Sequence, residues 1–515
     1  MSTEPVAATP ASLSEERMHR QPPFDGTDPA ALLAEVRRVR DTVAAEAEAL
    51  MARWAPRLER TAYRDSAANL AAYLALRRLD LRPLQAALAP WGLSSLGRSE
   101  SRVMPSLDAI IANLETICGS DGPHGRPTPE EFVRGVRLLE QNTAAVFGPP
   151  ATNRKTRILV TLSERAAHDL DRVRTMMRAG MDCARVNCAH DGPALWSAMI
   201  DNIRTAAAEQ GRPCPVLMDL AGPKIRTRHV LAPEGETVKR GDRVLLTFGE
   251  PLADPRHPFQ ASCAAPEVLR RVPVGAAVSI KDGLIVGTVE AVTEDGLVMA
   301  VTHTPPGGQP LLEEKGINFP DTALDVSPLT PDDLANLDFV ARHADIVSYS
   351  FVQRPEDMAL LQDELTARRP DLPPLPIVAK IETKLAFANL PDLIVQAAGR
   401  NPFGVMIARG DLAVEIGYER LSEVQEEILW LCEAAHVPVI WATQVLESLV
   451  KRGMPSRGEF TDAAMADRAE CVMLNKGKYV ADGIAVLDNV LRRMELHQVK
   501  KSPQLRPLAA WAGMR

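Results

Sequence analysis

The sequence predicts an α/β protein built on a (β/α)8 (TIM) barrel, with an all-β domain inserted after the third strand and a helical domain at the amino terminus. Eight short apolar runs alternate with amphipathic helical stretches between residues 156 and 495. Strand-helix repeats of this number are what such a barrel requires. A segment of different character, 228–315, interrupts the alternation, and the residues before about 145 have helical spacing.

The amino-terminal region, 1–150, is rich in Ala, Leu and Arg from about residue 29. Stretches such as ALLAEVRRVRDTVAAEAEALMARW repeat apolar residues at the spacing of one helix face, so we expect a helical region, whose role the sequence does not indicate. The first 25 residues lack the apolar segment of a signal peptide. No run of about 18 apolar residues occurs in the chain, so the sequence predicts no membrane span.

The predicted barrel strands lie in two parts of the chain, 151–227 and 316–500, and a tail follows at 501–515. The strands are TRILVTL (156–162), CARVNC (183–188), PVLMDL (215–220), DIVSYSF (345–351), PIVAKIE (376–382), GVMIAR (404–409), PVIWAT (438–443) and CVMLN (471–475). An open doubly wound sheet is the alternative fold. That alternative is weaker because no GxGxxG motif follows any of these strands.

The inserted segment, 228–315, carries β signals of its own, separated by Gly, Pro and Asp turns. These signals are ETVKRGDRVLLTF, GAAVSIKDGLIVGTVEAV and GLVMAVTHT. The segment leaves the barrel after the third strand, on the face where barrel active sites lie. We therefore expect a β lid domain that could close over a ligand.

Composition excludes several classes of protein. The formal net charge is −8 and the isoelectric point is about 5.8, and Lys and Arg never form a basic tract, which argues against a nucleic-acid partner. The seven cysteines include no CxxC pair, and no His cluster has zinc spacing, so neither a disulfide framework nor a structural metal is indicated. A reducing cytoplasm is the expected location.

Polar residues concentrate where the predicted strands end, which is where a barrel of this type places its catalytic groups. They are Arg185, Asn187 and His190 at the end of strand two, Asp219 at the end of strand three with Lys224 and Arg226 following it, Ser350 at the end of strand four, Lys380 and Glu382 at the end of strand five, Arg409, Gly410 and Asp411 at the end of strand six, and Thr443 and Gln444 at the end of strand seven. Glu382 and Asp411 follow adjacent strands, which suits Mg²⁺ completed by substrate oxygens and water. The cations imply a phosphorylated ligand. For any single residue, a charge that only meets solvent is an equal alternative, but the whole set is harder to explain that way.

The chain resembles the pyruvate kinase family in six segments, in the family's order and with matching spacing from about 155 to 495. The segments are VLMDLAGPKIRT, KGINFPDTALDVSPLT, SFVQRPEDM, IVAKIET, GVMIARGDLAVEIG and PVIWATQVLESLVKRGMPSRGEFTDAA. VKRGDRVLL and VSIKDGLIVGTV resemble its lid domain. The resemblance covers neither the first 150 residues nor the family's usual carboxyl-terminal domain, for which we find no counterpart.

The resemblance implies phosphoryl transfer from phosphoenolpyruvate to ADP, which yields pyruvate and ATP. It implies that Glu382 and Asp411 hold Mg²⁺ (or Mn²⁺) and that the catalytic residues are Lys380, Arg226, Arg185 and Thr443. Electrostatic stabilisation by the cations and proton relay by Thr443 are the implied roles. The implied substrate-binding residues are Gly410, Asp411, Ser350 and Lys224, and the implied nucleotide-binding residues are Asn187 and His190. Asp219 would help organise a monovalent ion site.

Two departures from the family pattern change what the resemblance implies. The second-strand motif usually reads Asn-Phe-Ser-His, but here it is Asn187-Cys188-Ala189-His190, which removes a hydroxyl ligand for a monovalent cation. Many relatives carry Glu where this chain has Lys224 and need K⁺, so we expect that K⁺ is not required. After the eighth strand, Asn475-Lys476-Gly477-Lys478 replaces the usual Ser-Gly-Glu-Thr near the nucleotide, which leaves the preferred acceptor open.

Two other functions stay open at this stage. One is a Mg²⁺-dependent lyase or aldolase that stabilises a pyruvate enolate, and Lys380 and the lid argue against it. The other is a regulatory protein that binds phosphoenolpyruvate without catalysis, which the retained catalytic residues disfavour. The expected partners are phosphoenolpyruvate and ADP or ATP, with no nucleic acid and no membrane, and the sequence leaves a homo-oligomer open.

Overall fold

The computed structural model describes residues 28–93, 96–120, 125–322 and 326–504, so the predicted tail from residue 505 and the first 27 residues lie outside the described residues. The chain forms two compact units. One unit contains 28–56, 64–138 and 434–436, and the other contains 57–63, 139–433 and 437–504. Short 3-10 helices lie at Ala55–Arg57, Thr61–Tyr63, Ala89–Trp91, Leu96–Arg98, Glu100–Arg102 and Ala466–Arg468.

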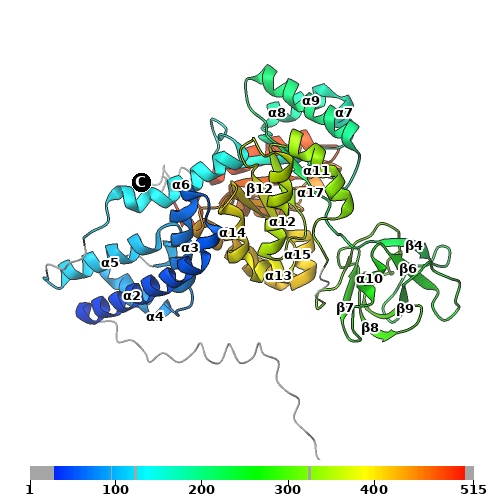
Figure 1. Cartoon of the computed structure of the whole chain (residues 1–515), viewed down its shortest axis with the longest axis horizontal. Coiled ribbons are helices and arrows are strands. Elements are labelled where there is room, and N and C mark those ends of the chain that lie inside the picture. The colour runs from blue at the N-terminus through cyan, green and yellow to red at the C-terminus, as the bar shows by residue number, and fades with distance from the viewer. Residues whose placement is uncertain (1–27, 94–95, 121–124, 323–325, 505–515) are drawn as a thin grey trace, which may run out of the picture. The chain divides into compact units, whose positions relative to one another are not determined.

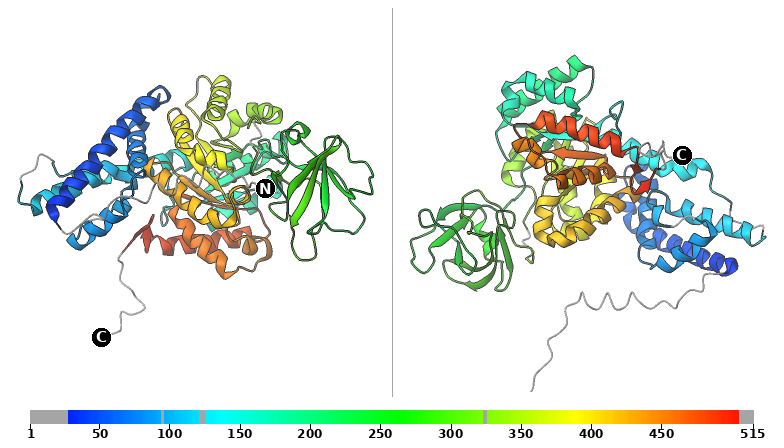
Figure 2. Two further views of the ribbon diagram at one scale, coloured as in Figure 1. Left: turned by 90° about the horizontal axis from the view of Figure 1, so that it is seen from below. Right: turned by 180° about the vertical axis from the view of Figure 1, so that it is seen from behind.

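The first unit is helical. Its helices are α2 (Pro29–Trp54), α3 (Arg64–Leu76), α4 (Arg82–Leu88), α5 (Val103–Ile117) and the beginning of α6 (Pro129–Phe147). Asp28 caps α2 by accepting hydrogen bonds from the N–H groups of Ala30 and Ala31. Apolar residues of α2 at helical spacing, such as Leu32 and Val36, are buried where α2 packs against α3 and α5. Figure 2 shows these helices in blue and cyan.

The second unit contains a closed barrel of eight parallel strands, in the order β1-β15-β14-β13-β12-β11-β3-β2. The strands are β1 (Arg157–Thr161), β2 (Cys183–Asn187), β3 (Val216–Asp219), β11 (Ile346–Tyr349), β12 (Ile377–Ile381), β13 (Phe403–Ala408), β14 (Val439–Ala442) and β15 (Cys471–Leu474). Each lies within one of the eight predicted runs except for the first residue of β13, so the predicted barrel is confirmed. Its interior is filled by apolar side chains such as Leu159, Val378 and Ile440, together with Phe147 from the end of α6.

Helices alternate with the barrel strands. They are α7 (Arg165–His168), α8 (Leu170–Ala179), α9 (Pro193–Gln210), α11 (Pro331–His343), α12 (Pro355–Arg368), α13 (Lys384–Ala388), α14 (Leu390–Ala398), α15 (Arg409–Ile416), α16 (Tyr418–Ala434), α17 (Glu447–Arg452), α18 (Arg457–Met465) and α19 (Val480–Met494). A short hairpin, β16 (Gln498–Val499) and β17 (Ser502–Pro503), follows. Within the described ranges, no helix combines the length and the apolar character that a membrane crossing demands.

The inserted segment extends slightly past its predicted bounds at both ends and forms a seven-stranded sheet in the order β10-β7-β8-β9-β5-β6-β4, drawn in green in Figure 1. The strands are β4 (Thr227–Leu231), β5 (Arg243–Thr247), β6 (Phe259–Cys263), β7 (Ala277–Ile280), β8 (Ile285–Val292), β9 (Gly296–His303) and β10 (Ile317–Asn318), and a short helix, α10 (Pro266–Leu269), follows β6. The predicted lid is confirmed. Strands β4, β6 and β10 were not predicted because they are short and lack a run of β-branched residues.

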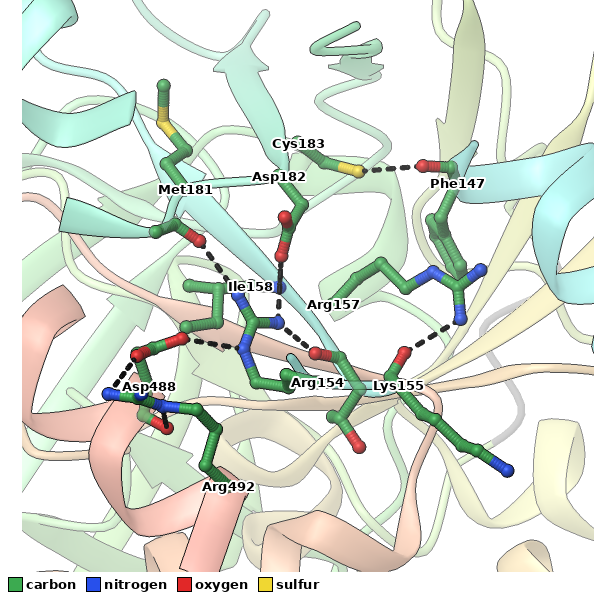
Figure 3. Close-up of polar contacts among 12 residues, drawn as sticks. Phe147, Arg154, Lys155, Arg157, Ile158, Met181, Asp182, Cys183, Asp488 and Arg492 are labelled. Carbon is green, nitrogen blue, oxygen red and sulfur yellow. Dashed lines mark hydrogen bonds and ion pairs between the residues drawn. The ribbon is translucent and has the colours of Figure 1, made fainter. Parts of the chain in front are cut away.

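A buried arginine joins segments at the amino-terminal ends of the barrel strands (Figure 3). The Arg154 side chain is 1% exposed, and its Nε and Nη1 donate to Asp488 Oδ1 at 3.0 Å and Asp182 Oδ2 at 2.8 Å. Its remaining N–H groups meet the carbonyl oxygens of Thr156 and Gly180. This guanidinium links α19 to the turn before β2. Because it precedes β1, it lies at the amino-terminal face of the barrel, away from the carboxyl ends of the strands, so we assign it a structural role.

Candidate active site

The two carboxylates of the predicted metal site follow neighbouring strands. Strands β12 and β13 pair directly, and Glu382 follows the end of β12 while Asp411 lies in the first turn of α15. Glu382 is buried and its Oε2 accepts the Phe351 N–H at 2.7 Å. Burial raises the pKa of Glu382 and the nearby charge of Asp411 raises it further, although Lys380 opposes both. Two carboxylates that repel each other in a buried site form a pair that a divalent cation would stabilise.

No third protein ligand completes this pair, because the described residues contain no group of three or more His, Cys, Asp or Glu side chains able to hold a metal. The pair therefore fits Mg²⁺ only if water and substrate oxygens supply the remaining ligands, as magnesium sites in phosphoryl-transfer enzymes commonly require.

Lys380 lies at the centre of a buried polar network. Its Nζ donates to Ser350 Oγ at 2.7 Å, and it lies 3.1 Å from Glu382 Oε1 and 3.7 Å from Asp219 Oδ2. Burial alone would lower the pKa of this ammonium, but the charges of Asp219 and Glu382 outweigh burial and raise it. Lys380 therefore keeps its positive charge in a site from which water is largely excluded, where electrostatic interactions are strong.

Asp219 positions a second cation of the network. Its Oδ2 accepts Arg185 Nε at 2.9 Å, and Arg185 Nη1 donates to Thr161 Oγ1 at 2.9 Å. Burial opposes ionisation of Asp219, but the charges of Lys380 and Arg185 prevail and lower its pKa. Within the described residues its buried Oδ1 has no hydrogen-bond partner, which leaves one acceptor free for a further ligand.

Lys224 contacts the predicted metal site directly. Its Nζ donates to Asp411 Oδ1 at 2.7 Å, and both side chains are about one fifth exposed, at 22% and 18%. Arg226, two residues later, is instead directed to the Glu314 carbonyl, with Nη1 at 3.3 Å from the oxygen. The structure thus joins Lys224 to one carboxylate of the predicted metal site, Asp411. Among the described residues, no hydrogen bond or ion pair places Arg226 in the Lys380 network.

Thr443 and Gly410 lie side by side where β14 ends and α15 begins. A Cβ at Gly410 would lie 3.0 Å from Thr443 Cγ2, so a larger residue would press on Thr443. Thr443 has φ 72°, a backbone conformation that β-branched residues rarely adopt. Arg409 fixes this turn by donating to the carbonyls of Ala442 at 2.8 Å and Thr443 at 2.6 Å, and by pairing with Asp462. Arg409 is therefore engaged structurally, and Gly410 leaves the start of α15 accessible.

A second group of cations lies at the ends of β2, β3 and β15. Burial and the charges of Lys476, Arg226 and Arg185 lower the pKa of the exposed His190. Asn187 is half-buried beside it and accepts the Ala189 N–H at 3.1 Å. Such a concentration of positive charge suits a polyphosphate.

Lys476 belongs to this group of cations, but it was not among the residues predicted for the site. The unusual Asn-Lys-Gly-Lys motif after the eighth strand was the feature of the sequence that could have indicated it. Its position is fixed by its neighbours. Asn475 Oδ1 accepts the Lys476 N–H at 2.9 Å, and Arg172 Nη2 donates to the Gly477 carbonyl at 2.9 Å. A Cβ at Gly477 would lie 2.4 Å from the Val450 carbonyl oxygen, so glycine is required there.

The whole arrangement matches known proteins. A profile of the pyruvate kinase barrel domain matches residues 153–484. The chain belongs to the pyruvate kinase family. It is 32% identical over 388 residues to the pyruvate kinase PKLR of Rattus norvegicus, across 71% of this chain and 63% of that protein. It is 34% identical over 349 residues to the pyruvate kinase of Geobacillus stearothermophilus, across 66% of this chain and 57% of that protein.

Solved structures agree with the family assignment. A crystal structure of a pyruvate kinase from Cryptosporidium parvum superposes with a TM-score of 0.59 at 27% sequence identity, covering 68% of this chain and 72% of that chain. The match to the rat and Geobacillus pyruvate kinases covers 63% and 57% of their lengths, so this chain spans less than two thirds of either protein. The profile match begins at residue 153, so helices α2 to α6 lie outside the part that identifies the family.

Proposed function

We propose that this member of the pyruvate kinase family transfers the phosphoryl group of phosphoenolpyruvate to ADP, with Mg²⁺ or Mn²⁺ as cofactor and without a requirement for K⁺. The observation that carries the proposal is the buried network in which Lys380 lies between Glu382, Asp219 and Ser350. It combines a charged ammonium with two carboxylates suited to a divalent cation, and phosphoryl transfer depends mainly on such positioned charges.

In this proposal Glu382 and Asp411 hold the divalent cation, which supplies charge neutralisation at the phosphate when it is bound. Lys380 and Arg185 stabilise the charge that spreads over the transferring phosphoryl oxygens, and Asp219 holds both cations in place. Arg226 belongs to the same set only if the lid brings it closer to the network on ligand binding, because it now contacts Glu314. Ser350 orients the Lys380 ammonium by accepting a hydrogen bond from Nζ at 2.7 Å.

The turn at Gly410 is proposed to bind the substrate carboxylate and to place Thr443 for protonation of the product enolate. Backbone N–H groups of Gly410 and Asp411, at the start of α15, bind the substrate carboxylate. Loss of the phosphoryl group leaves an enolate, whose methylene carbon takes a proton. Thr443, packed against Gly410, relays that proton through water. Asn187, His190 and Lys476 bind the nucleoside diphosphate on the opposite side of the barrel mouth.

Independence from K⁺ is the second part of the proposal. The Lys224 ammonium is held at the metal carboxylates, so it supplies a positive charge that a bound K⁺ would otherwise supply. Ala189 removes a hydroxyl that K⁺ would need. Activity with tetramethylammonium as the only monovalent cation should stay within about twofold of activity in K⁺, because no ion has to be stripped of water. A tenfold drop would refute this part.

The metal assignment is tested with two isosteric variants. Glu382→Gln and Asp411→Asn should each reduce turnover by roughly a hundredfold or more, the size expected when a preorganised electrostatic group is lost. Near-normal turnover in either variant would show that the cation binds elsewhere. The proposal includes a cytoplasmic location, which suits seven cysteines that are all free thiols, and it leaves a homo-oligomer open.

A further inference from the structure

A cavity of about 430 Å³ lies beside the residues proposed to bind the metal, and apart from Lys224 none of its lining residues has a role in the proposed reaction. Its walls come from the loop after β3, the segment around β10, and the residues that follow β11 and β12. Eight of the sixteen lining residues are apolar, among them Ile225, Ile317, Phe319 and Leu385. The volume falls within the range of roughly 300 to 1,000 Å³ that small-molecule sites occupy.

The two lysines on the wall of this cavity already have anionic partners. Lys224 Nζ lies 2.7 Å from Asp411 Oδ1, and Lys384 Nζ lies 3.1 Å from Asp321 Oδ1. Their charges are therefore compensated, and an anionic ligand would gain little from entering. The cavity does not select for phosphate or carboxylate, which separates it from the cationic groups at the other side of the barrel mouth.

Hydrogen-bond acceptors, by contrast, are left without partners. Asn318 is 8% exposed and lines the cavity, and among the described residues its Oδ1 accepts no hydrogen bond. Thr322 Oγ1 is buried in the same wall and, among the described residues, it also has no hydrogen-bond partner. A buried acceptor without a donor is energetically unfavourable, so a ligand that supplies the donor gains affinity from it.

Glu415 adds a carboxyl group to the same wall. Burial is the main reason that the pKa of Glu415 is raised to about 7, and the negative charge of Asp411 raises it as well. Hydrogen bonds from the Asn318 side chain and the Lys384 backbone N–H, together with the charge of the Lys384 ammonium, act in the opposite direction. The group lies on α15, and the metal-binding network of Lys380 does not include it. A cation placed next to Glu415 would hold it ionised.

We propose that this cavity is a binding site for a small apolar molecule with a protonated amine, whose N–H groups donate to Glu415 and Asn318 Oδ1 while its apolar body packs against Phe319, Ile225 and Leu385. The proposal rests on the cavity and its acceptors alone and does not depend on the proposed phosphoryl transfer.

Isothermal titration calorimetry on the full chain at pH 8, where Glu415 is ionised, tests the head group that the site selects. The probes share an indole ring and differ in charge: tryptamine, tryptophol and indole-3-propionate. Tryptamine should bind at least about fivefold more tightly than tryptophol, the size expected for one partly buried charged hydrogen bond. Indole-3-propionate should bind most weakly. Equal affinities, preference for the anion, or no binding of tryptamine at 10 mM would overturn the proposal.

Matched variants locate the binding. Glu415→Gln keeps the shape of the side chain and should remove the preference for tryptamine over tryptophol, whereas Glu419→Gln, an exposed glutamate on α16, should leave it unchanged. If Glu415→Gln does not fold, Asn318→Leu serves instead, and it should weaken tryptamine binding by a similar factor. Unchanged tryptamine affinity in the folded variant would show that the amine binds elsewhere and would refute the site.

Discussion

The ion pair between Lys224 and Asp411 makes a strong prediction about metal affinity. If Asp411 is a metal ligand, a divalent cation must share or displace the Lys224 ammonium that lies 2.7 Å from Asp411 Oδ1. Lys224→Met removes this competitor and leaves the carboxylate free. We therefore expect the variant to bind Mn²⁺ more tightly than the wild type in the absence of substrate, even though its turnover falls.

The size of the effect follows from the geometry. A hydrogen bond to a charged group contributes about 1.5 to 3 kcal/mol when it is well protected from solvent. Because the two side chains are 22% and 18% exposed, solvent screening reduces this contribution to about 1 to 2 kcal/mol. At roughly 1.4 kcal/mol for each factor of ten, the affinity for Mn²⁺ should rise about 5- to 30-fold.

Free Mn²⁺ measured by electron paramagnetic resonance gives the affinity directly. Lys384→Met is the control, because it removes one positive charge from the same face but frees Asp321, which is not a proposed ligand. The control should shift the affinity by less than about twofold, as expected for an exposed pair. An unchanged or weaker affinity in Lys224→Met would refute the assignment of Asp411 as a metal ligand.

Three further predictions concern other residues. In steady-state kinetics, Lys380→Met should lower kcat by at least about a hundredfold with little change in KM for phosphoenolpyruvate, since the Lys380 ammonium acts mainly in the transition state. An unchanged kcat with a raised KM would make Lys380 a binding group only. Lys476→Ala should raise KM for ADP by about fivefold without changing KM for phosphoenolpyruvate, because it removes one solvent-exposed charge contact. An equal effect in the control variant Lys478→Ala would mean that position 476 has no special role. Arg154→Met should lower the free energy of unfolding by about 1.5 to 3 kcal/mol in urea titration, because two buried charged hydrogen bonds are lost while Asp182 keeps Arg212 and Asp488 keeps Arg492. Arg174→Met, which breaks a more exposed pair with Glu209, should cost clearly less, and equal losses would contradict the structural role of Arg154.

The barrel could be predicted from the sequence because its strands are buried on both sides and read as short apolar runs between helices. Strand β4 could not, since its residues Arg228 and His229 are exposed and the run TRHVL has no clear alternation. Strand β6, FQASC, is fully buried but contains no β-branched residue, so it gave no strand signal.

The candidate site residues could be found because each lies near or after the carboxyl end of a strand, and parallel strands bring these ends together. Their partners could not be predicted. The contact of Lys224 with Asp411 joins residues 187 positions apart, and no local pattern reports such a pairing. The burial of Arg154 was also beyond prediction, because a charged residue between a turn and a strand is usually exposed.

Phosphoryl transfer itself is measured most directly by ³¹P nuclear magnetic resonance of the purified full chain with phosphoenolpyruvate, ADP and Mg²⁺, repeated with other nucleoside diphosphates and with Asp411→Asn. The phosphoenolpyruvate signal should decline as the γ-phosphate signal of ATP grows, and Asp411→Asn or chelation of Mg²⁺ should stop both changes. An unchanged phosphoenolpyruvate signal with every nucleotide would contradict the proposed function, as would release of inorganic phosphate without a nucleoside triphosphate.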